Sequence, residues 1–335
     1  MADELTKVVD VITPELYTDY MNIFTKEKSA LLQSGAAVSD STVSENISAG
    51  GLLVNMPMWN DLNGEDEVID DGAKGLTTGK IVASADIAAV MYRGKGWSVN
   101  ELAGQIAGSD PLQALMTKIG TYWLRREQQV FISVLNGLFA AADTGTSTPA
   151  GVLNKTHLLD KKGSNIDKYT ILDAKQLLGD AADQLSMIVM HSAIYTSLQK
   201  LELIDYIQPS QGGARIPTYQ GYRVVVDDGV PSYGSGATKY YTTYLFAEGS
   251  IGRNTGTPGR LTMFETARDA AKGNNNIFTR RAFTMHPYGV KFTNVDRESG
   301  FITPTNKDLA NPKNWAKVYE DKNIGIVALW CKPLA

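Results

Sequence analysis

Between Leu52 and Trp97, apolar and polar residues alternate with the two-residue period of β-strands. Two such stretches, at 52–59 and at about 80–92, flank a connection of roughly 20 residues that is rich in Gly, Asp and Glu. Before Ala73 this connection has no basic residue, and its acidic residues are Asp61, Glu65, Asp66, Glu67, Asp70 and Asp71. A segment of this composition cannot form a core of its own. We therefore expect a long β-hairpin whose acidic tip projects from the body.

A helical period follows the hairpin. Asp110 and Pro111 supply an N-cap and a first-turn proline, and residues 112–142 contain no further proline. Apolar residues recur at helical spacing on both sides of a polar patch at 125–129, namely Leu112, Leu115, Ile119, Tyr122, Val130, Val134 and Leu138. At about 1.5 Å per residue this spine helix is ~45 Å long. We expect its middle turn, with Arg125 and Arg126, to lie partly outside any core.

Residues 1–45 are typical of an arm rather than a domain. A helix start at Thr13-Pro14-Glu15 precedes an apolar set that includes Tyr20 and Phe24. So short a segment cannot bury this set alone, so it must dock on another surface.

The second half of the chain mixes helices with strands. A helix that begins at Thr170 with Asp173, a strand at 187–190 and a helix capped by Ser192 indicate a mixed αβ unit. Further strands are predicted at 219–231, 240–246, 261–266, 277–286, 290–294 and 324–330, with a short helix at 314–320. The fold class is therefore α+β. We divide the chain into an arm (1–45), the hairpin and its flanks (46–99), a spine-helix unit (100–168), the mixed αβ unit (169–258) and returning strands with the carboxy-terminal end (259–335).

Composition narrows the function further. The 335 residues are 43% hydrophobic, enough for one large core or two modest ones. Thirty-two Lys and Arg against 36 Asp and Glu give a net charge of -4, which disfavours a protein whose main task is to grip nucleic-acid phosphates. The single Cys331 excludes an internal disulfide and a cysteine-built zinc site, and it fits a reducing cytoplasm.

Neither export nor membrane insertion is expected. The amino terminus, MADELTKVVD, carries acidic residues where a signal peptide carries basic ones. The longest apolar run, 130–142, is 13 residues long and is broken by Asn136 and Gly137, whereas a membrane span needs ~20. We expect a soluble protein.

Motifs for catalysis are weak. The three histidines, His157, His191 and His286, lie far apart without metal-binding spacing, and we interpret them as structural. Asp227 and Asp228 could form an acid–base pair, but Asp before Gly229 is also ordinary turn chemistry, because its side chain bonds backbone amides two residues on. The turn is the better interpretation. No phosphate-binding loop or nucleophile elbow is complete, and we expect no cofactor, no metal and no catalysis.

The charged pairs allow two interpretations. Arg280 and Arg281 fall in a strand, where alternation places them on opposite faces. Arg125 and Arg126 are either a solvated face of the helix or, as a sharper hypothesis, the surface on which the acidic hairpin tip of a neighbouring copy lies. A cluster of tyrosines could stack on bases, but a sheet wall or a subunit contact is the favoured interpretation: Tyr219, Tyr222, Tyr233, Tyr240, Tyr241 and Tyr244.

Three stretches resemble a known family. They are ITPELYTDYMNIFTKEKSALLQSG (12–35), MHSAIYTSLQKLELIDYIQPSQG followed by IPTYQGYRVVVDDGVP (190–231), and FITPTNKDLANPKNWAKVYEDKNIGIVAL (301–329). With the order of the parts, they resemble the major capsid proteins of tailed bacteriophages, in the coat-protein branch of the Hong Kong 97-type fold. The resemblance covers nearly the whole chain. It implies an amino-terminal arm, an extended hairpin called the E-loop, a peripheral domain with the spine helix, and an axial αβ domain.

The resemblance also implies a function. Copies would assemble through hexamers and pentamers into an icosahedral shell around double-stranded DNA, which they would contact weakly, in a virion capsid built in the host bacterial cytoplasm. Scaffolding, portal and decoration proteins are the implied partners. Relatives with a fused scaffolding segment carry about a hundred more residues before the arm, so a separate scaffold or none is expected. Some relatives cross-link a hairpin lysine to a neighbour's asparagine; Lys74 and Lys80 lie in this hairpin but in no recognisable reactive motif.

Physical reasoning leads to the same expectation without the resemblance. An isolated hairpin is marginally stable in water, and an arm cannot bury its apolar stripe alone, so each copy should give and receive extensions. Two alternatives stay open. One is an encapsulin, a cargo compartment of the same fold, in which Tyr20 and Phe24 would contact cargo. The more distant one is an α+β enzyme acting through Asp227 and Asp228.

Overall fold

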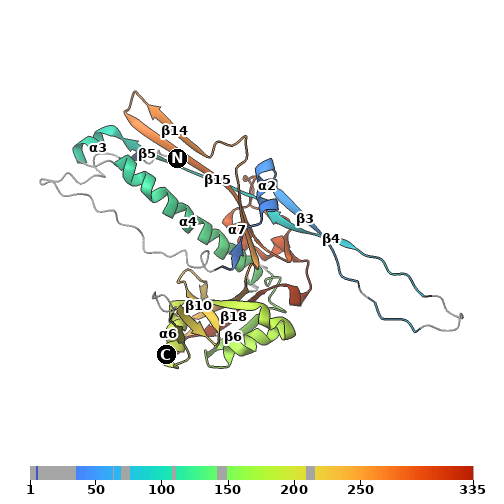
Figure 1. The fold of residues 1–335 in the computed structure, drawn as a ribbon. Coiled ribbons are helices and arrows are strands. Elements are labelled where there is room, and N and C mark those ends of the chain that lie inside the picture. The colour runs from blue at the N-terminus through green and yellow to red at the C-terminus, as the bar shows by residue number, and fades with distance from the viewer. Residues whose placement is uncertain are drawn as a thin grey trace.

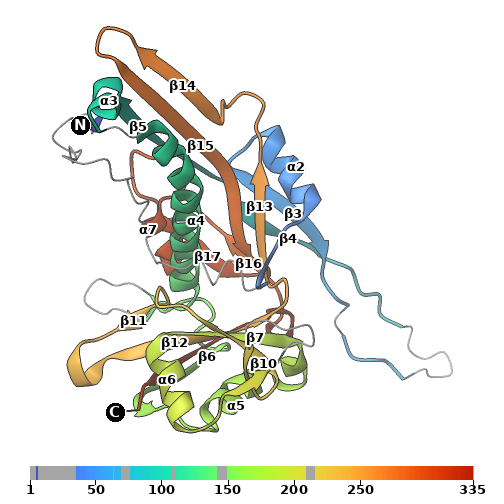
Figure 2. The same ribbon diagram turned by 60° about the vertical axis from the view of Figure 1, so that its left-hand side comes forward.

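The computed structural model describes residues 5–6, 35–62, 64–68, 76–107, 111–141, 149–208 and 216–334. One sheet runs alongside the long helix α4 (Pro111–Leu138), a second sheet lies at the carboxy-terminal end of that helix, and a hairpin stands off to one side (Figures 1 and 2). In spatial order, the first sheet consists of β1 (Leu5–Thr6), β5 (Met91–Asn100), β15 (Asn274–Pro287), β13 (Ile251–Gly256) and β2 (Ala37–Val38), with β14 (Phe264–Asp269) also beside β15.

The second sheet contains the mixed αβ part of the chain. Its strands, in spatial order, are β6 (Leu158–Asn165), β18 (Ile326–Lys332), β12 (Tyr240–Ala247), β7 (Leu185–Met190), β10 (Tyr222–Val226), β9 (Ile216–Tyr219) and β8 (Asp205–Ile207), with β11 (Ser232–Tyr233) beside β12. Two small sheets pair β3 (Leu53–Trp59) with β4 (Ala83–Ala89), and β16 (Val290–Phe292) with β17 (Trp315–Lys317).

Short helices complete the described structure. The α-helices besides α4 are α2 (Ser41–Ala49), α3 (Glu101–Ala107), α5 (Thr170–Lys175), α6 (Ser192–Lys200) and α7 (Asn306–Ala310). The 3-10 helices are η2 (Gln176–Gln184), η3 (Gly236–Thr238), η4 (Pro312–Asn314) and η5 (Asp321–Asn323). In the described part of the chain, no helix combines the length and the apolar character required to cross a bilayer.

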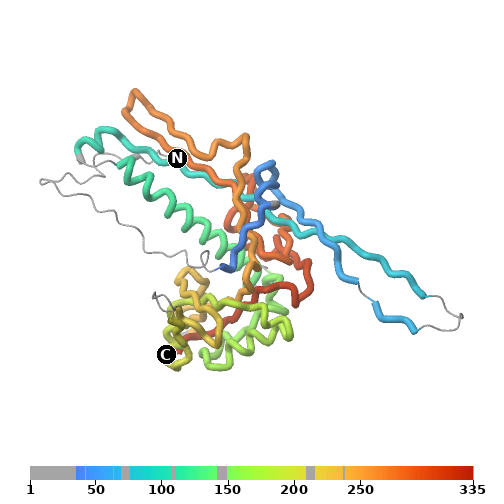
Figure 3. The backbone as a smooth tube through the Cα atoms, in the orientation of Figure 1, coloured from blue at the N-terminus to red at the C-terminus, as the bar shows by residue number. Residues whose placement is uncertain are grey.

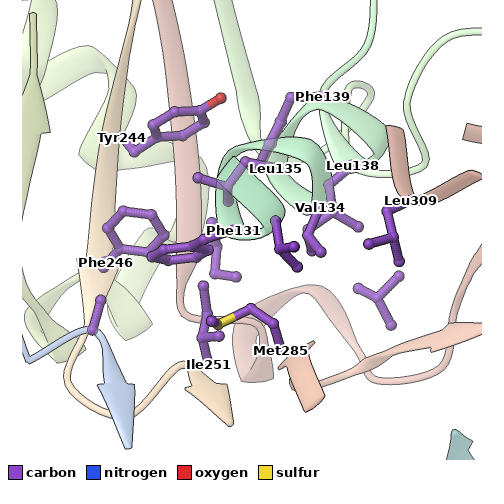
Figure 4. Close-up of a cluster of buried hydrophobic side chains, with 14 of the residues drawn as sticks. Phe131, Val134, Leu135, Leu138, Phe139, Tyr244, Phe246, Ile251, Met285 and Leu309 are labelled. Atoms are coloured by element: carbon purple, nitrogen blue, oxygen red, sulfur yellow. The ribbon is translucent and has the colours of Figure 1, made fainter. Parts of the chain in front are cut away.

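The carboxy-terminal half of α4 forms the main core. Phe131, Leu135 and Leu138 are fully buried, and Figure 4 shows Phe131 beside Phe246 of the second sheet and Leu138 on the side of Leu309. In the amino-terminal half of α4, by contrast, no residue before Trp123 is buried. The predicted helix is confirmed, and so is its partly exposed middle turn, in which Arg126 and Gln129 are exposed while Glu127 and Gln128 are buried.

Side-chain alternation in β15 separates two cores. Phe283 and Met285 point into the main core, while Ala282 joins a smaller core with Val43 and Ile47 of α2. This follows from the two-residue period of a strand, which sends neighbouring side chains to opposite faces. The root of the hairpin, with Val54 and Ala88, belongs to the smaller core.

The centre of the second sheet is buried on both faces. In β7, Met187 and Val189 face the main core, while Ile188 and Met190 face a third core that Ile171 of α5 and Ile194 and Leu198 of α6 complete. β7 pairs in parallel with β10 and antiparallel with β12. Strands covered on both faces are continuous apolar runs, which is how β7 reads in the sequence.

Two predictions for the carboxy-terminal part are wrong. The last strand, predicted among the returning strands, lies in the second sheet between β12 and β6. The helix predicted at 314–320 is absent: η4 ends at Asn314, and β17 follows. The cause is Asn314, which is fully buried and donates its side-chain amide to the carbonyls of Asp296, at 2.7 Å, and Asp308, at 2.9 Å, so it fixes a turn.

Two predicted helix caps also differ. The N-cap of α6 is His191, whose Nδ1 accepts from the amide of Ala193 at 3.1 Å, rather than Ser192. At the start of α5, Asp167 rather than Asp173 accepts the amide of Thr170, at 2.8 Å. Hydrogen bonds from Thr170 and from backbone amides lower the pKa of Asp167.

The predicted hairpin is present and projects from the body (Figure 3). β3 and β4 pair from Leu53 opposite Ala89 to Trp59 opposite Ala83, with Pro57 opposite Ala85. Beyond this ladder, the amide of Asn60 donates to the carbonyl of Val82 at 2.9 Å.

A buried acidic side chain fastens the root of the hairpin to the body. Asp86 of β4 is fully buried; it accepts from His286 Nε2 at 2.9 Å and from the amide of Gly289 at 2.9 Å. Gly289 follows β15 with a φ of 89°, a conformation that favours glycine. Asp86 thereby holds the hairpin at a fixed place on the end of β15.

Replacing Asp86 by Ala should destabilise the chain. The change leaves the imidazole of His286 and the amide of Gly289 buried without their acceptor, which costs about 1–3 kcal/mol for each unsatisfied group. Urea unfolding followed by circular dichroism measures the loss. Glu248→Ala, at an exposed position, is the control and should shift the midpoint little. Equal midpoints for the two variants would contradict the anchoring role.

Candidate assembly interface

The hairpin tip is an exposed acidic surface. Asp61, Glu65, Asp66 and Glu67 are exposed, and none of these four forms an ion pair with the described basic residues. The carboxylate of Glu67 accepts from the amide of Thr77 at 2.9 Å and from its hydroxyl, and these hydrogen bonds lower the pKa of Glu67. The described tip is thus acidic and is closed across its two sides by Glu67 and Thr77.

The same hairpin exposes large apolar side chains. The exposed residues are Trp59, Leu62, Val68, Leu76, Ile81 and Val82, and Val68 reaches 92% exposure. Exposed apolar groups of this size gathered on one projecting element mark an interaction surface rather than a solvated one. The hairpin therefore offers both charge and apolar area to a partner.

Not every predicted contact residue lies among the described residues. Asp70, Asp71 and Lys74 of the hairpin lie outside them, as do Tyr20 and Phe24 of the arm. Lys80 is described and exposed.

The two arginines of the basic patch on α4, Arg125 and Arg126, differ in exposure. Arg126 is exposed; its Nη1 donates to Gln129 Oε1 at 2.6 Å, and its guanidinium lies 5.6 Å from the ring centroid of Tyr122. Arg125 is half-buried. Arg126 is therefore the more exposed charge of the pair.

A third arginine, which the sequence analysis missed, lies close to Arg126. Nη2 of Arg93, on β5, donates to the carbonyl of Pro304 at 2.6 Å and to Asn306 Oδ1 at 3.2 Å. Burial lowers the pKa of Arg93, the carboxylate of Asp308 raises it, and the charge of Arg126 lowers it. Arg93 and Arg126 line one pocket of about 260 Å³ between α4, β5 and the start of α7.

Glu127 holds the middle of α4 to the first sheet. Its carboxylate is almost fully buried and accepts from Arg253 Nε at 3.0 Å and from Arg281 Nη1 at 2.7 Å. Arg281 also lies over the ring of Trp123 at 5.3 Å. The sequence did carry a signal for this cluster, since Trp123, Glu127 and Phe131 follow each other at four-residue spacing on one helix face.

The prediction for the strand arginines is confirmed. Arg281 points to α4 and Glu127, whereas Arg280 points away and pairs with Glu265 of β14 at 3.1 Å.

The tyrosine cluster does not form one platform. Tyr219, Tyr241 and Tyr244 are buried, so their rings belong to cores. Tyr233 stacks on Tyr240 with centroids 5.5 Å apart. The cluster supports the interpretation as a sheet wall rather than a base-stacking surface.

The candidate catalytic pair is a turn. Asp227 is buried and accepts from the amide of Gly229 at 2.8 Å and from the side chain of Gln128, while Asp228 accepts from the amide of Ser192 at 3.1 Å. The turn interpretation of Asp227 is thereby confirmed. Among the described residues, no group of three or more His, Cys, Asp or Glu could hold a metal ion.

The histidines and the cysteine have structural environments. His157 is buried and its Nε2 lies 3.0 Å from the carbonyl oxygen of Asp321; burial lowers the pKa of His157. His191 caps α6, and His286 contacts Asp86. Burial raises the pKa of Cys331 to about 12, which leaves the thiol protonated and unreactive.

Comparison with known proteins decides the family. Residues 82–301 match the model of a family described as phage capsid protein. The chain is 39% identical over 328 residues to the major capsid protein of Bacillus phage SPP1, a match that covers 96% of this chain and 97% of the relative. The chain belongs to the phage capsid protein family.

Solved structures of phage capsids share the fold of this capsid protein. The capsid of Ralstonia phage GP4 superposes with a TM-score of 0.60 at 10% identity, covering 96% of each chain. The Cyanophage Pam1 capsid gives 0.56 at 12% identity, covering 99% of each chain, and the head of Helicobacter pylori bacteriophage KHP40 gives 0.56 at 8% identity, covering 96% of each chain. The predicted α+β, Hong Kong 97-type fold is confirmed.

Removing the carboxylate of Glu127 should loosen α4 in the capsid protein. In Glu127→Ala, Arg253 and Arg281 lose a buried charged acceptor, and the free energy of unfolding should fall by about 2–3 kcal/mol. The matched control is Glu265→Ala, which removes the partially exposed partner of Arg280 and should cost less than about 1 kcal/mol. Urea titration of both variants tests the difference, and a larger loss in Glu265→Ala would refute it.

Proposed function

We propose that this chain is the coat subunit of a tailed-phage head, and that its copies associate through hexamers and pentamers into an icosahedral shell around double-stranded DNA. Membership of the phage capsid protein family supports this function. The observation that carries it is the hairpin, which projects with exposed apolar and acidic side chains and whose described residues contact their own body at the hairpin root.

The direction of the hairpin favours closed rings. In Figures 1 and 2 it leaves the body on the side away from the amino-terminal half of α4. A contact between two different surfaces of identical copies is heterologous, and such contacts close into rings when the rotation between copies allows it. The hairpin of one copy on the α4 side of the next is such a contact.

Charge supports this placement of the hairpin. In the proposed ring, the acidic tip lies over the basic patch of the neighbouring copy: Asp61, Glu65, Asp66, Glu67, Asp70 and Asp71 face Arg125 and Arg126. Lys74 and Lys80 lie in the same contact, and Tyr20 and Phe24 dock the arm on a neighbour. Interfaces built this way gain specificity from charge and stability from apolar area.

The parts of the subunit take the roles expected from the family. The first sheet, α4 and α7 form the peripheral domain, and the second sheet with α5 and α6 forms the axial domain. The axial domain includes β6 and β18, which the division by sequence placed outside the mixed αβ unit. The arm and the E-loop connect neighbours. Assembly takes place in the host bacterial cytoplasm with a portal and, where the phage encodes them, scaffolding and decoration proteins.

The shell encloses the DNA without binding it tightly. A net charge of -4 supports weak, non-specific contact with packaged DNA, because tight binding requires many neutralised phosphates. An encapsulin has less support, since the matched family and the curated relative are phage capsid proteins. Catalysis through Asp227 and Asp228 has still less, because both carboxylates are engaged by backbone amides.

The full chain should form particles of megadalton mass when expressed in bacteria, together with a scaffolding protein where one is encoded beside it. Shortening the hairpin by replacing residues 60–82 with a two-residue turn should leave the unfolding midpoint nearly unchanged but abolish the particles. Analytical ultracentrifugation and electron microscopy distinguish these outcomes. Single compact molecules from the unaltered chain at high concentration would refute the proposal.

A further inference from the structure

The pocket beside Arg93 has the chemistry of an anion site. Its walls come from β5, the middle of α4, β15 and the start of α7, and its lining includes Arg93, Arg126, Gln129 and Asn306 above Trp123 and Phe283. The two guanidinium groups donate to neutral oxygens, those of Pro304 and Asn306 for Arg93 and that of Gln129 for Arg126. The pocket therefore combines two cations with a partly apolar floor.

Within the described part of one copy, no carboxylate pairs with either cation. Asp308 is the carboxylate whose charge raises the pKa of Arg93. Its Oδ1 is occupied by the amide of Glu298, at 2.7 Å, and its Oδ2 by the amide and hydroxyl of Thr305, at 2.7 and 2.9 Å. A half-buried guanidinium without an anion is unfavourable, and a carboxylate is the ligand that its planar donors fit best.

Two carboxylates of the hairpin are suited to bind the arginines of this pocket. Asp61 accepts from the amide of Leu62 at 2.8 Å, and Glu67 is bound by Thr77, so both are already engaged. Glu65 and Asp66 are exposed next to each other in the described tip. Asp66 lies 13 positions after Leu53 at the hairpin root, so at ~3.3 Å per residue an extended chain can carry it up to about 40 Å from that root.

The pocket cannot receive the hairpin of its own copy. The hairpin points away from α7 and from the amino-terminal half of α4 in both views (Figures 1 and 2). The carboxylate must therefore come from a second copy. We propose that the pocket of Arg93 and Arg126 is the receptor for Glu65 or Asp66 of the neighbouring subunit's hairpin, an inference that rests on the shell function proposed above.

A charge exchange tests the receptor. Arg126→Glu alone and the double change Glu65→Arg with Asp66→Arg should each raise the lowest subunit concentration that gives shells about tenfold. Combining all three changes in one chain should return the lowest shell-forming concentration to within about threefold of the value for the unaltered chain. Arg93→Lys, which keeps the charge but loses the planar donors, should raise it less than Arg126→Glu does. Urea unfolding checks that each variant is folded.

Controls separate a specific pocket from general electrostatics. Glu67→Arg changes charge in the same tip at a carboxylate already bound by Thr77, and should have a clearly smaller effect than the double change. As a direct test, a copy with Glu65→Cys mixed with a copy with Gln129→Cys should give disulfide-linked dimers on oxidation, whereas Glu65→Cys mixed with Arg268→Cys should not.

Three outcomes overturn the receptor while leaving the shell function standing. These are an equal effect of Glu67→Arg, a failure of the exchange to restore assembly, and a loss of packaged DNA without any change in shell formation when Arg126 is altered. The last result would assign the pocket to nucleic-acid phosphates. Absence of shells from the unaltered chain would instead refute the proposed function itself.

Discussion

The burial of the carboxy-terminal half of α4 between two sheets is the constraint on which the rest of the subunit depends. Phe131, Leu135 and Leu138 contact both sheets and α7, so a few turns of one helix hold together segments that are more than a hundred residues apart. Close-packed side chains of this kind fix both distance and angle. With that junction rigid, the elements that leave it can be extended and still point in defined directions.

Buried charges set those directions. Glu127 ties α4 to β13 and β15 through two arginines, and Asp86 ties the hairpin to the end of β15. A buried carboxylate tolerates only the position in which its donors are met, so it adds a fixed register to the apolar packing. The subunit thus uses buried charge at the two places where an element must leave the core at a fixed angle.

Much of this architecture could be predicted from the sequence, because its strongest signals are local. The spine helix has a proline start and helical spacing, and the hairpin has two alternating stretches around an acidic connection. The position of β18 could not be predicted in this way, since pairing with β12 and β6 is a contact between distant segments that no local pattern encodes. The end of η4 was missed for a similar reason, because Asn314 takes its partners from two other segments.

The candidate interface shows the same contrast between local sequence signals and contacts between distant segments. Its proposed acidic half is one continuous stretch of sequence that a local pattern can name, whereas its proposed basic half joins Arg126 of α4 to Arg93 of β5, 33 positions apart. Arg125, the neighbour of Arg126, looked equivalent in the sequence but is half-buried, because a helix turns adjacent residues by about 100°. A pocket is a property of the fold, and only its individual members are visible in the sequence.

Pro57 adds a consequence for how copies meet. It lies in the middle of β3, a strand that pairs on one side with β4 and has no other partner in the described sheets. A proline has no N–H to donate, so the free border of β3 cannot template a continuous ladder with a strand from another molecule. Runaway stacking into fibres is thereby discouraged, and growth is directed toward contacts between side chains, which can end in a closed surface.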